Sequence, residues 1–326
     1  MTELSNSEIL ERLDPGSNVQ EIASGGGCRV FRLSDPTGDG YMTIYDILPG
    51  IMLMYNDFHL EQCRSDFITD ENLLCIDHCR KGRIECRSSS GHLYYMSDGD
   101  FRLDNRMDHR GMIHMPLRHF HGLTIGLHIP TAQRTLTESM PLFSVSLPAL
   151  AEKYCSRHNL ILHDEERTGR IFAELYHLPQ SREQDLIRLK IMELLLSLQT
   201  LRIDEAAADR PYYPAALAEK VKEIHAFLTE DLSREHTLES LANQFAIPQT
   251  SMRRCFEGIY GSPIHRYLKN CRMRRAAELL RSAPDMKIAE IAAEVGYHNP
   301  ARFSAAFREI TGLTPNAYRS TDKEEL

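Results

Sequence analysis

The last third of the chain carries one sequence unit twice, and this repeat restricts the folds that the segment can adopt. The matched pairs, at offsets of 50 or 51 residues, are Leu241/Ile291, Ala242/Ala292, Phe256/Phe307, Gly261/Gly312 and Tyr267/Tyr318. Each unit predicts a short helix, a turn of a few residues and a second helix with one apolar face. This is the layout of a helix-turn-helix, so we predict two such motifs, at residues 237–257 and 287–308.

The second helix of a helix-turn-helix can enter the major groove of DNA. We expect Phe256 and Phe307 to anchor these two helices, and Ala242 and Ala292 to lie where the helices of each unit cross. The residues expected to point outward are Thr250, Arg253 and Arg254 in the first unit, and Asn299, Ala301, Arg302 and Ala305 in the second. The alternative reading of an arginine on an exposed helix is that it is merely solvated.

The segment between the two units predicts one connecting helix over residues 263–282, with proline in its first turn. A helix of this length spans about 30 Å, close to the ~34 Å of one DNA turn, so one chain can present two reading helices to successive major grooves. From Arg253 to Arg281 there are eight basic residues and two acidic ones, a local charge of +6 suited to phosphate contacts.

The overall charge conceals this basic stretch. The 326 residues have a net charge of -8 and a pI near 6.0, which taken alone argues against a general nucleic-acid binder. Residues 216–326 carry +1, however, and the rest of the chain carries -9. The acidic excess therefore belongs to the part of the chain outside the repeat.

Gly296-Tyr297 followed by NPARFSAAFREITGLTPNAYR resembles the signature of the AraC/XylS transcription regulators, and residues 237–280 resemble the first half of the same domain. The resemblance implies a regulator that binds promoter DNA, often an activator that contacts RNA polymerase. It places Thr250, Arg253 and Arg254 where relatives contact bases and phosphates, and Pro300, Ala301 and Ala305 at the matching places of the second helix.

Many relatives have arginine where Ala305 stands. An alanine cannot form the two hydrogen bonds that an arginine makes with guanine. We therefore expect the first helix to supply most base discrimination, and the second to act through Asn299, Arg302 and the backbone.

The N-terminal part predicts a β domain. From about Tyr41 to Ile129, short apolar runs end in turn residues roughly every ten positions, which indicates an antiparallel sandwich or barrel. The family resemblance implies a cupin-like barrel that binds an effector. The spacing of LLCIDHCRKGRIECR and YMSDGDF, with the ending NPARFSAAFREITG, is similar to that of regulators that respond to iron–siderophore complexes, so the expected effector is a small molecule or a metal complex.

We therefore expect an α+β chain with four parts: a cupin-like effector-binding domain at 1–140, a helical segment at 141–202, a linker at 203–216 and the DNA-binding domain at 217–326. The segment from Gln184 to Leu201 has an apolar face wider than one core-facing stripe needs. Two interpretations are equally open: the helix forms a homodimer, or it is buried inside one subunit.

A metal or catalytic site is the alternative for the N-terminal part. Five histidines fall within twenty residues, namely His109, His114, His119, His121 and His128, but no carboxylate follows them at the spacing of cupin enzymes. Cys75, Cys79 and Cys86 do not form a C-x-x-C pair, and no catalytic triad, P-loop or dinucleotide motif is present. We predict no metal, no cofactor, no catalytic residues and no enzyme activity. The rival hypothesis is a cupin-type metalloenzyme with an accessory helical domain.

The predicted localisation depends on the N-terminus and on the most apolar stretch of the chain. The N-terminus has no apolar run behind a basic start, and the most apolar helix candidate, Leu186 to Leu198, contains Arg188, Lys190 and Glu193. We therefore expect a cytoplasmic protein without a membrane role, whose eight cysteines are reduced thiols.

Overall fold

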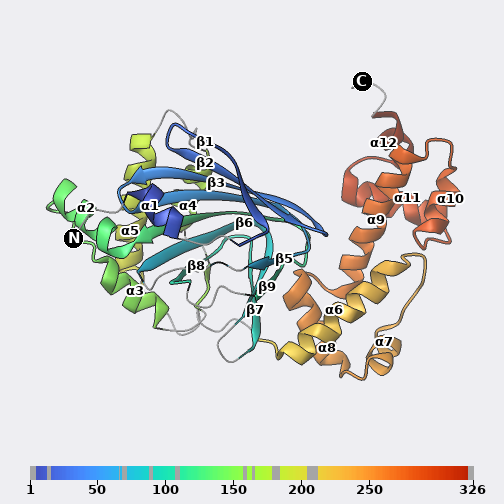
Figure 1. Ribbon diagram of the computed structural model, residues 1–326. Coiled ribbons are helices and arrows are strands. Elements are labelled where there is room, and N and C mark those ends of the chain that lie inside the picture. The colour runs from blue at the N-terminus through green and yellow to red at the C-terminus, as the bar shows by residue number, and fades with distance from the viewer. Residues whose placement is uncertain are drawn as a thin grey trace. The chain divides into compact units, whose positions relative to one another are not determined.

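The computed structural model describes residues 5–12, 16–65, 67, 72–87, 91–106, 111–156, 160–163, 166–177, 184–203 and 212–321. The chain divides into two compact units, Met1–Tyr212 and Tyr213–Leu326, and each is described by itself (Figure 1). Most of the predicted linker, residues 204–211, lies outside the described residues, as does His109.

The N-terminal unit is built on a nine-stranded antiparallel sheet with the order β1-β2-β3-β4-β10-β6-β8-β11, in which β7 also pairs with β6. Its strands are β1 (Val19–Gly25), β2 (Cys28–Asp35), β3 (Gly38–Leu48), β4 (Ile51–His59), β6 (Leu73–Arg87), β7 (Leu93–Ser97), β8 (Asp100–Asp104), β10 (Phe120–His128) and β11 (Leu162–His163). A separate ribbon pairs β5 (Gln62–Ser65) with β9 (Gly111–His114), and helix α1 (Asn6–Arg12) precedes the strands.

The sheet is open where a closed barrel was expected. Among the described strands, β1 and β11 are the two edges and no pairing joins them. Strands β1 and β2 precede Tyr41, where the predicted β region began. Alternation of apolar residues did not reveal β1 because all of its residues except Val19 are exposed. Barrel closure needs backbone hydrogen bonds between the two edge strands, and the outer backbone groups of β1 form an open edge instead.

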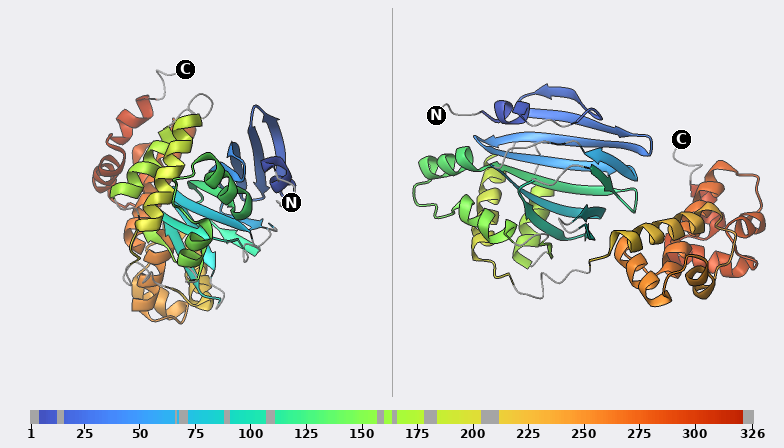
Figure 2. Two further views of the ribbon diagram at one scale, coloured as in Figure 1. Left: turned by 90° about the vertical axis from the view of Figure 1, so that its left-hand side faces the viewer. Right: turned by 60° about the horizontal axis from the view of Figure 1, so that its bottom comes forward.

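Helices cover one face of this sheet (Figure 2). They are α2 (Ile129–Ser139), α3 (Leu147–Cys155), α4 (Glu166–His177) and α5 (Gln184–Thr200). One apolar core joins the inner side of these helices to alternate strand residues such as Leu53, Ile76 and Ile125. Helix α2 falls inside the predicted β part, residues 1–140, because it begins directly after β10 with no connecting loop between them.

The C-terminal unit is helical over its described residues. Its helices are α6 (Ala215–Glu230), α7 (Leu238–Gln244), α8 (Gln249–Tyr260), α9 (Ile264–Ser282), α10 (Ile288–Glu294), α11 (Pro300–Thr311) and α12 (Pro315–Thr321). The pairs α7–α8 and α10–α11 are the two predicted helix-turn-helix motifs, and α9 connects them. None of the described helices is both long and apolar enough to cross a membrane.

Candidate DNA-reading helices and a candidate ligand cavity

The two repeat units have the same local packing. Phe256 and Phe307 are fully buried, as predicted. Each stands edge-on to the tyrosine that follows it by eleven positions, Tyr267 at 5.5 Å and Tyr318 at 5.4 Å between ring centroids. Helices α8 and α11 both end at a glycine in the left-handed conformation, Gly261 and Gly312, so the repeated glycines are C-terminal caps.

The turns inside the two motifs also correspond. Ala246 and Gly296 both have positive φ, 47° and 79°. The next residue in each turn donates its N–H to the carbonyl of the alanine that was predicted at the helix crossing, Ala242 or Ala292. Ala292 is fully buried as expected, whereas Ala242 is only half-buried. The first motif therefore places an alanine in a conformation that glycine adopts without strain.

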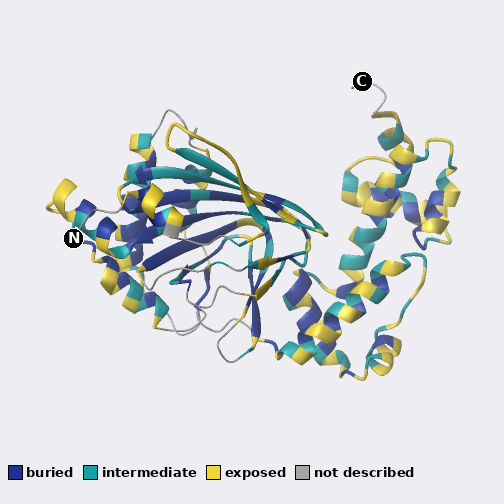
Figure 3. Ribbon diagram, in the orientation of Figure 1, coloured by how far each residue is buried: buried dark blue, intermediate teal, exposed yellow. Residues whose placement is uncertain are grey.

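All eight predicted DNA-contacting residues are exposed, as Figure 3 shows for the outer faces of these helices. In α8 these residues are Thr250, Arg253 and Arg254, on the side opposite the buried Met252, Cys255 and Phe256. In α11 they are Ala301, Arg302 and Ala305 together with Pro300, the first residue of the helix, and Asn299, which precedes it.

Asn299 has a structural role that the sequence interpretation missed. Its Oδ1 accepts hydrogen bonds from the backbone N–H groups of Ala301 and Arg302 at 2.9 and 3.2 Å, so it is the N-cap of α11. The signal was present in the sequence, since an asparagine directly before a proline-led helix is a typical N-cap. The side-chain oxygen of Asn299 is therefore engaged in hydrogen bonds within the fold.

Four of the eight basic residues between Arg253 and Arg281 are used inside the fold. Lys269 pairs with Glu309 at 2.7 Å and Arg275 with Glu278 at 3.2 Å. Arg272 donates to the carbonyls of Leu232 and Arg234, and Arg281 lies over the ring of Tyr318. The other four have no acidic partner within ion-pairing distance among the described residues: Arg253, Arg254, Arg266 and Arg274. Fewer of these side chains are therefore without a contact inside the fold than the sequence count indicated.

Tyr213, which the sequence interpretation placed in the linker, is buried against α8. Its hydroxyl donates to the carbonyl of Arg254 at 3.3 Å. A Cβ at Gly258 would lie 1.9 Å from the Tyr213 hydroxyl oxygen, which explains a glycine in the middle of this helix. Tyr213 therefore supports the helix that carries the candidate arginines.

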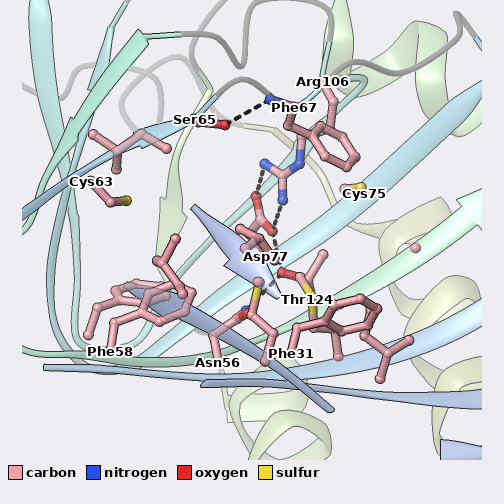
Figure 4. Close-up of a pocket in the computed structure, with 18 of the residues that line it drawn as sticks. Phe31, Asn56, Phe58, Cys63, Ser65, Phe67, Cys75, Asp77, Arg106 and Thr124 are labelled. Carbon is pink, nitrogen blue, oxygen red and sulfur yellow. Dashed lines mark hydrogen bonds and ion pairs between the residues drawn. The ribbon is translucent and has the colours of Figure 1, made fainter. Parts of the chain in front are cut away.

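In the N-terminal unit, the face of the sheet opposite the helices curls around a cavity of about 510 Å³ (Figure 4). Alternate residues of β4 point into it, namely Met52, Met54, Asn56 and Phe58. The lining is completed by the other strands and by residues of α1, β5 and β9. A cavity of this size suits a drug-sized ligand.

A buried ionic cluster lies on one wall of this cavity (Figure 4). Asp77 receives hydrogen bonds from Arg106 Nη1 at 2.7 Å, Arg102 Nε at 3.0 Å and Thr124 Oγ1 at 2.8 Å. Burial alone would raise the pKa of Asp77, but Arg106 and Arg102 outweigh it and hold the pKa well below its usual value. Asp104 lies 3.2 Å from Arg102, so two carboxylates balance two guanidinium groups.

The described histidines of this group do not all gather at one place: His119 and His121 lie near each other and near Asp57 and His59 of β4, whereas His114 and His128 lie apart from them. His128 is buried and its Nδ1 lies 2.9 Å from Thr131 Oγ1, while His114 lies in β9. The potential ligand atoms of His119, His59 and Asp57 lie within 4.8 Å of one another, and His59 Nε2 is 3.1 Å from Asp57 Oδ1. Sequence reasoning did not group these three residues because Asp57 and His59 belong to a different strand, β4.

The cysteines singled out in the sequence are interior residues. Cys75, Cys79 and Cys86 are all buried. Burial raises the pKa of all three thiols, that of Cys75 to about 12. They are consequently protonated at neutral pH, the form that is least reactive.

Comparison with known proteins matches the helical part of the chain. A family described as "Helix-turn-helix domain" matches residues 241–321. The activator RhaR of Mannheimia succiniciproducens is 33% identical over 101 residues, which cover 31% of this chain and 36% of that protein. A putative AraC-like transcription regulator of Streptomyces antibioticus is 29% identical, over 46% of this chain and 49% of that protein. The chain therefore spans about a third to a half of the length of these relatives.

Solved structures with similar sequence include the C-terminal domain of a response regulator and a DNA-binding domain. The C-terminal domain of AraT, a response regulator from Geobacillus stearothermophilus, is 33% identical, covering 33% of this chain and 88% of that chain, with a TM-score of 0.31. The DNA-binding domain of AdpA, solved with a target DNA, is 27% identical, covering 32% of this chain and 93% of that chain, also with a TM-score of 0.31.

Proposed function

We propose that this chain, whose C-terminal unit is an AraC-type helix-turn-helix domain, is an effector-responsive transcription regulator that reads promoter DNA with α8 and α11. The observation that carries the proposal is the pair of matching motifs, each with an anchored second helix and exposed residues near its start. Relatives described as transcriptional activators support activation of transcription. We propose RNA polymerase as the partner.

The N-terminal unit is proposed as the effector-binding part. Its curled sheet takes the place of the expected cupin-like barrel, and its cavity supplies the site for the effector. Regulators among the relatives favour this role over that of a cupin-type metalloenzyme, and accordingly we propose a cytoplasmic protein without enzyme activity. The proposed parts are 1–140, 141–202, a linker from 203 to Tyr212 and a DNA-binding domain from Tyr213, because Tyr213 packs on α8 and α6 begins at Ala215.

Helix α5 supports a homodimer. Ile187, Leu194 and Leu198 are buried in the core of the unit, whereas Leu189 is 61% exposed. Leu186 and Leu196 on the same helix are also exposed, so an apolar strip remains on the outer side of α5. A second copy of the chain would bury it.

DNA binding is tested with duplexes that the full-length chain selects from a random-sequence pool, followed by fluorescence anisotropy at several salt concentrations. The four arginines without an acidic partner, together with the exposed Arg302 of α11, predict a slope of log K against log [salt] of about -4.5 per chain, at about -0.9 for each phosphate neutralised. All eight basic residues of the 253–281 stretch together with Arg302 would give about -8.1. Absence of binding at low salt would refute the proposed function.

Arg254→Ala tests base reading. Discrimination between the selected duplex and one with single base changes should fall by about 1–3 kcal/mol, because an arginine that reads a base is lost. Arg275→Ala is the matched control, since Arg275 is exposed on α9 and pairs with Glu278. An unchanged specificity profile for Arg254→Ala would contradict its assignment.

A further inference from the structure

We propose that the cavity of the N-terminal unit binds an uncharged, mainly apolar small molecule carrying a hydroxyl or N–H donor, and that Asn56 accepts the hydrogen bond from that donor. This ligand class deepens the proposed effector role, and its regulatory meaning rests on that proposed function. Binding of a ligand in the cavity does not depend on whether the chain regulates transcription.

The walls set the apolar character of the ligand. Aromatic and thioether side chains reach the cavity from several strands of the sheet and from the β5–β9 side, and they include Phe31, Phe58, Phe120, Met54, Met96 and Met115. Methionines adapt their shape to a ligand because their side chains are unbranched and flexible. Burial of apolar ligand surface against these walls supplies most of the binding free energy.

A chain of hydrogen bonds determines which side-chain atom of Asn56 is left without a partner. The ionised carboxylate of Asp77 can only accept, so the Thr124 hydroxyl donates to it at 2.8 Å. The Thr124 oxygen is then left as an acceptor, and Asn56 Nδ2 donates to it at 3.2 Å. This orientation leaves Asn56 Oδ1, which is buried and has no hydrogen-bond partner among the described residues.

An acceptor without a partner, in a side chain only 5% exposed, is costly unless a ligand or water supplies a donor. Asn56 also lines the cavity, so a molecule that fills the cavity is placed to supply the missing donor. A hydroxyl or an N–H group on the ligand meets this requirement. A carboxylate cannot, since it only accepts.

The charges around the cavity argue for a neutral ligand. Asp77 and Asp104 balance Arg102 and Arg106, and Arg29 pairs with Glu21 at 2.6 Å. A charged ligand group beside these balanced pairs would lose its hydration without gaining a counter-ion. Arg29 Nη1, buried and without a partner among the described residues, can donate to a neutral acceptor such as a carbonyl or ether oxygen.

The test compares three probes of one chain length: 1-octanol, its methyl ether and octanoate. Isothermal titration calorimetry with the full-length chain should show 1-octanol binding about tenfold more tightly than the ether, because only the alcohol donates to Asn56. Octanoate should bind more weakly than the alcohol. Equal affinity for the alcohol and the ether, or tighter binding of octanoate than of the alcohol, overturns the proposal without any measurement on a variant protein.

Asn56→Leu should reduce the alcohol-to-ether preference to about one while the ether still binds. Asn18→Leu is the matched control, because Asn18 Oδ1 is also buried without a partner among the described residues but does not line the cavity; its preference should stay about tenfold. If Asn56→Leu does not fold, Met54→Trp, which fills the cavity from the next inward position of β4, should abolish binding of all three probes.

These measurements use no DNA, and the salt-dependence experiment above uses no ligand. Failure of one therefore leaves the other standing. Octanol binding that is unchanged in Met54→Trp would place the ligand elsewhere and refute the cavity assignment.

Discussion

Burial of His225 makes the stability of the C-terminal unit depend on pH. His225, in α6, stacks on Tyr260 with 4.2 Å between ring centroids, and its Nε2 lies 2.9 Å from the Tyr267 hydroxyl oxygen. Burial lowers the pKa of His225 to about 4. The imidazole is therefore neutral in the folded unit but titrates near 6.5 in the unfolded chain.

The size and sign of the effect follow from these two values. Below pH 6.5 the unfolded state binds a proton that the folded state does not, so the free energy of unfolding falls as the pH drops from about 6.5 to about 4. At 1.36 kcal/mol per pKa unit, the difference of about 2.5 units corresponds to about 3.4 kcal/mol. Above pH 6.5 this contribution to stability is fully present.

The sequence contains no tryptophan, so Phe245→Trp, a half-buried position beside Phe227, gives a fluorescence signal from this unit alone. Urea unfolding at several pH values between 7 and 4 is then compared in this background with and without His225→Phe, which keeps the stacking on Tyr260. The difference in pH dependence between pH 7 and 4 should be about 3 kcal/mol, because at pH 4 the folded-state imidazole is itself half protonated. Burial also lowers the pKa of His236, but His236 is present in both proteins and cancels.

Tyr267→Phe serves as the control, because it removes the hydrogen bond and keeps the buried imidazole. Its pH dependence should match that of the parent. If His225→Phe retains the full pH dependence, the reasoning from burial of this imidazole is refuted.

Two further substitutions test local features of the helix-turn-helix motifs. Asn299→Ala removes the acceptor for the N–H groups of Ala301 and Arg302 and should lower the free energy of unfolding by about 0.5–2 kcal/mol in urea titrations; a change below 0.3 kcal/mol would contradict the capping role. Ala246→Gly relieves an alanine at positive φ and should raise the thermal midpoint of the C-terminal unit, because glycine, found at the equivalent Gly296, avoids about 1 kcal/mol of strain. A lower midpoint would show that the turn is not strained.

Sequence reasoning succeeded where structure is determined locally. The repeat placed both helix-turn-helix motifs because anchors such as Phe256 and Phe307 are separated from their partners by only eleven residues of chain. Strand β1 was missed because all of its residues except Val19 are exposed, so it has no apolar alternation to detect. Strand β2 was missed although it is mostly half-buried and its Leu33 is buried. Closure of a sheet is likewise a long-range property, which the spacing of strands along the chain does not determine.

The cavity is the clearest case of a site that sequence reasoning could not predict. Asp77, Thr124 and Asn56 come from three strands, with Asn56 and Thr124 separated by 68 positions, and nothing in their local sequence indicates that they meet. Only the order β4-β10-β6 brings them together. In the same way, the count of eight basic residues was correct, but only the fold showed that Arg272, for example, is used to hold backbone carbonyls.

The two proposed reading helices differ in what they offer to DNA. The start of α8 has no side-chain cap, so its first backbone N–H groups are open to a phosphate, and Arg253 and Arg254 are exposed one turn later. The start of α11 is already capped by Asn299, and two of its outward positions are alanines. Small side chains allow a helix to approach the groove closely but read little beyond a thymine methyl group. In the proposed complex α8 therefore supplies most of the affinity and the base discrimination, while α11 contributes mainly through its fit to the second groove.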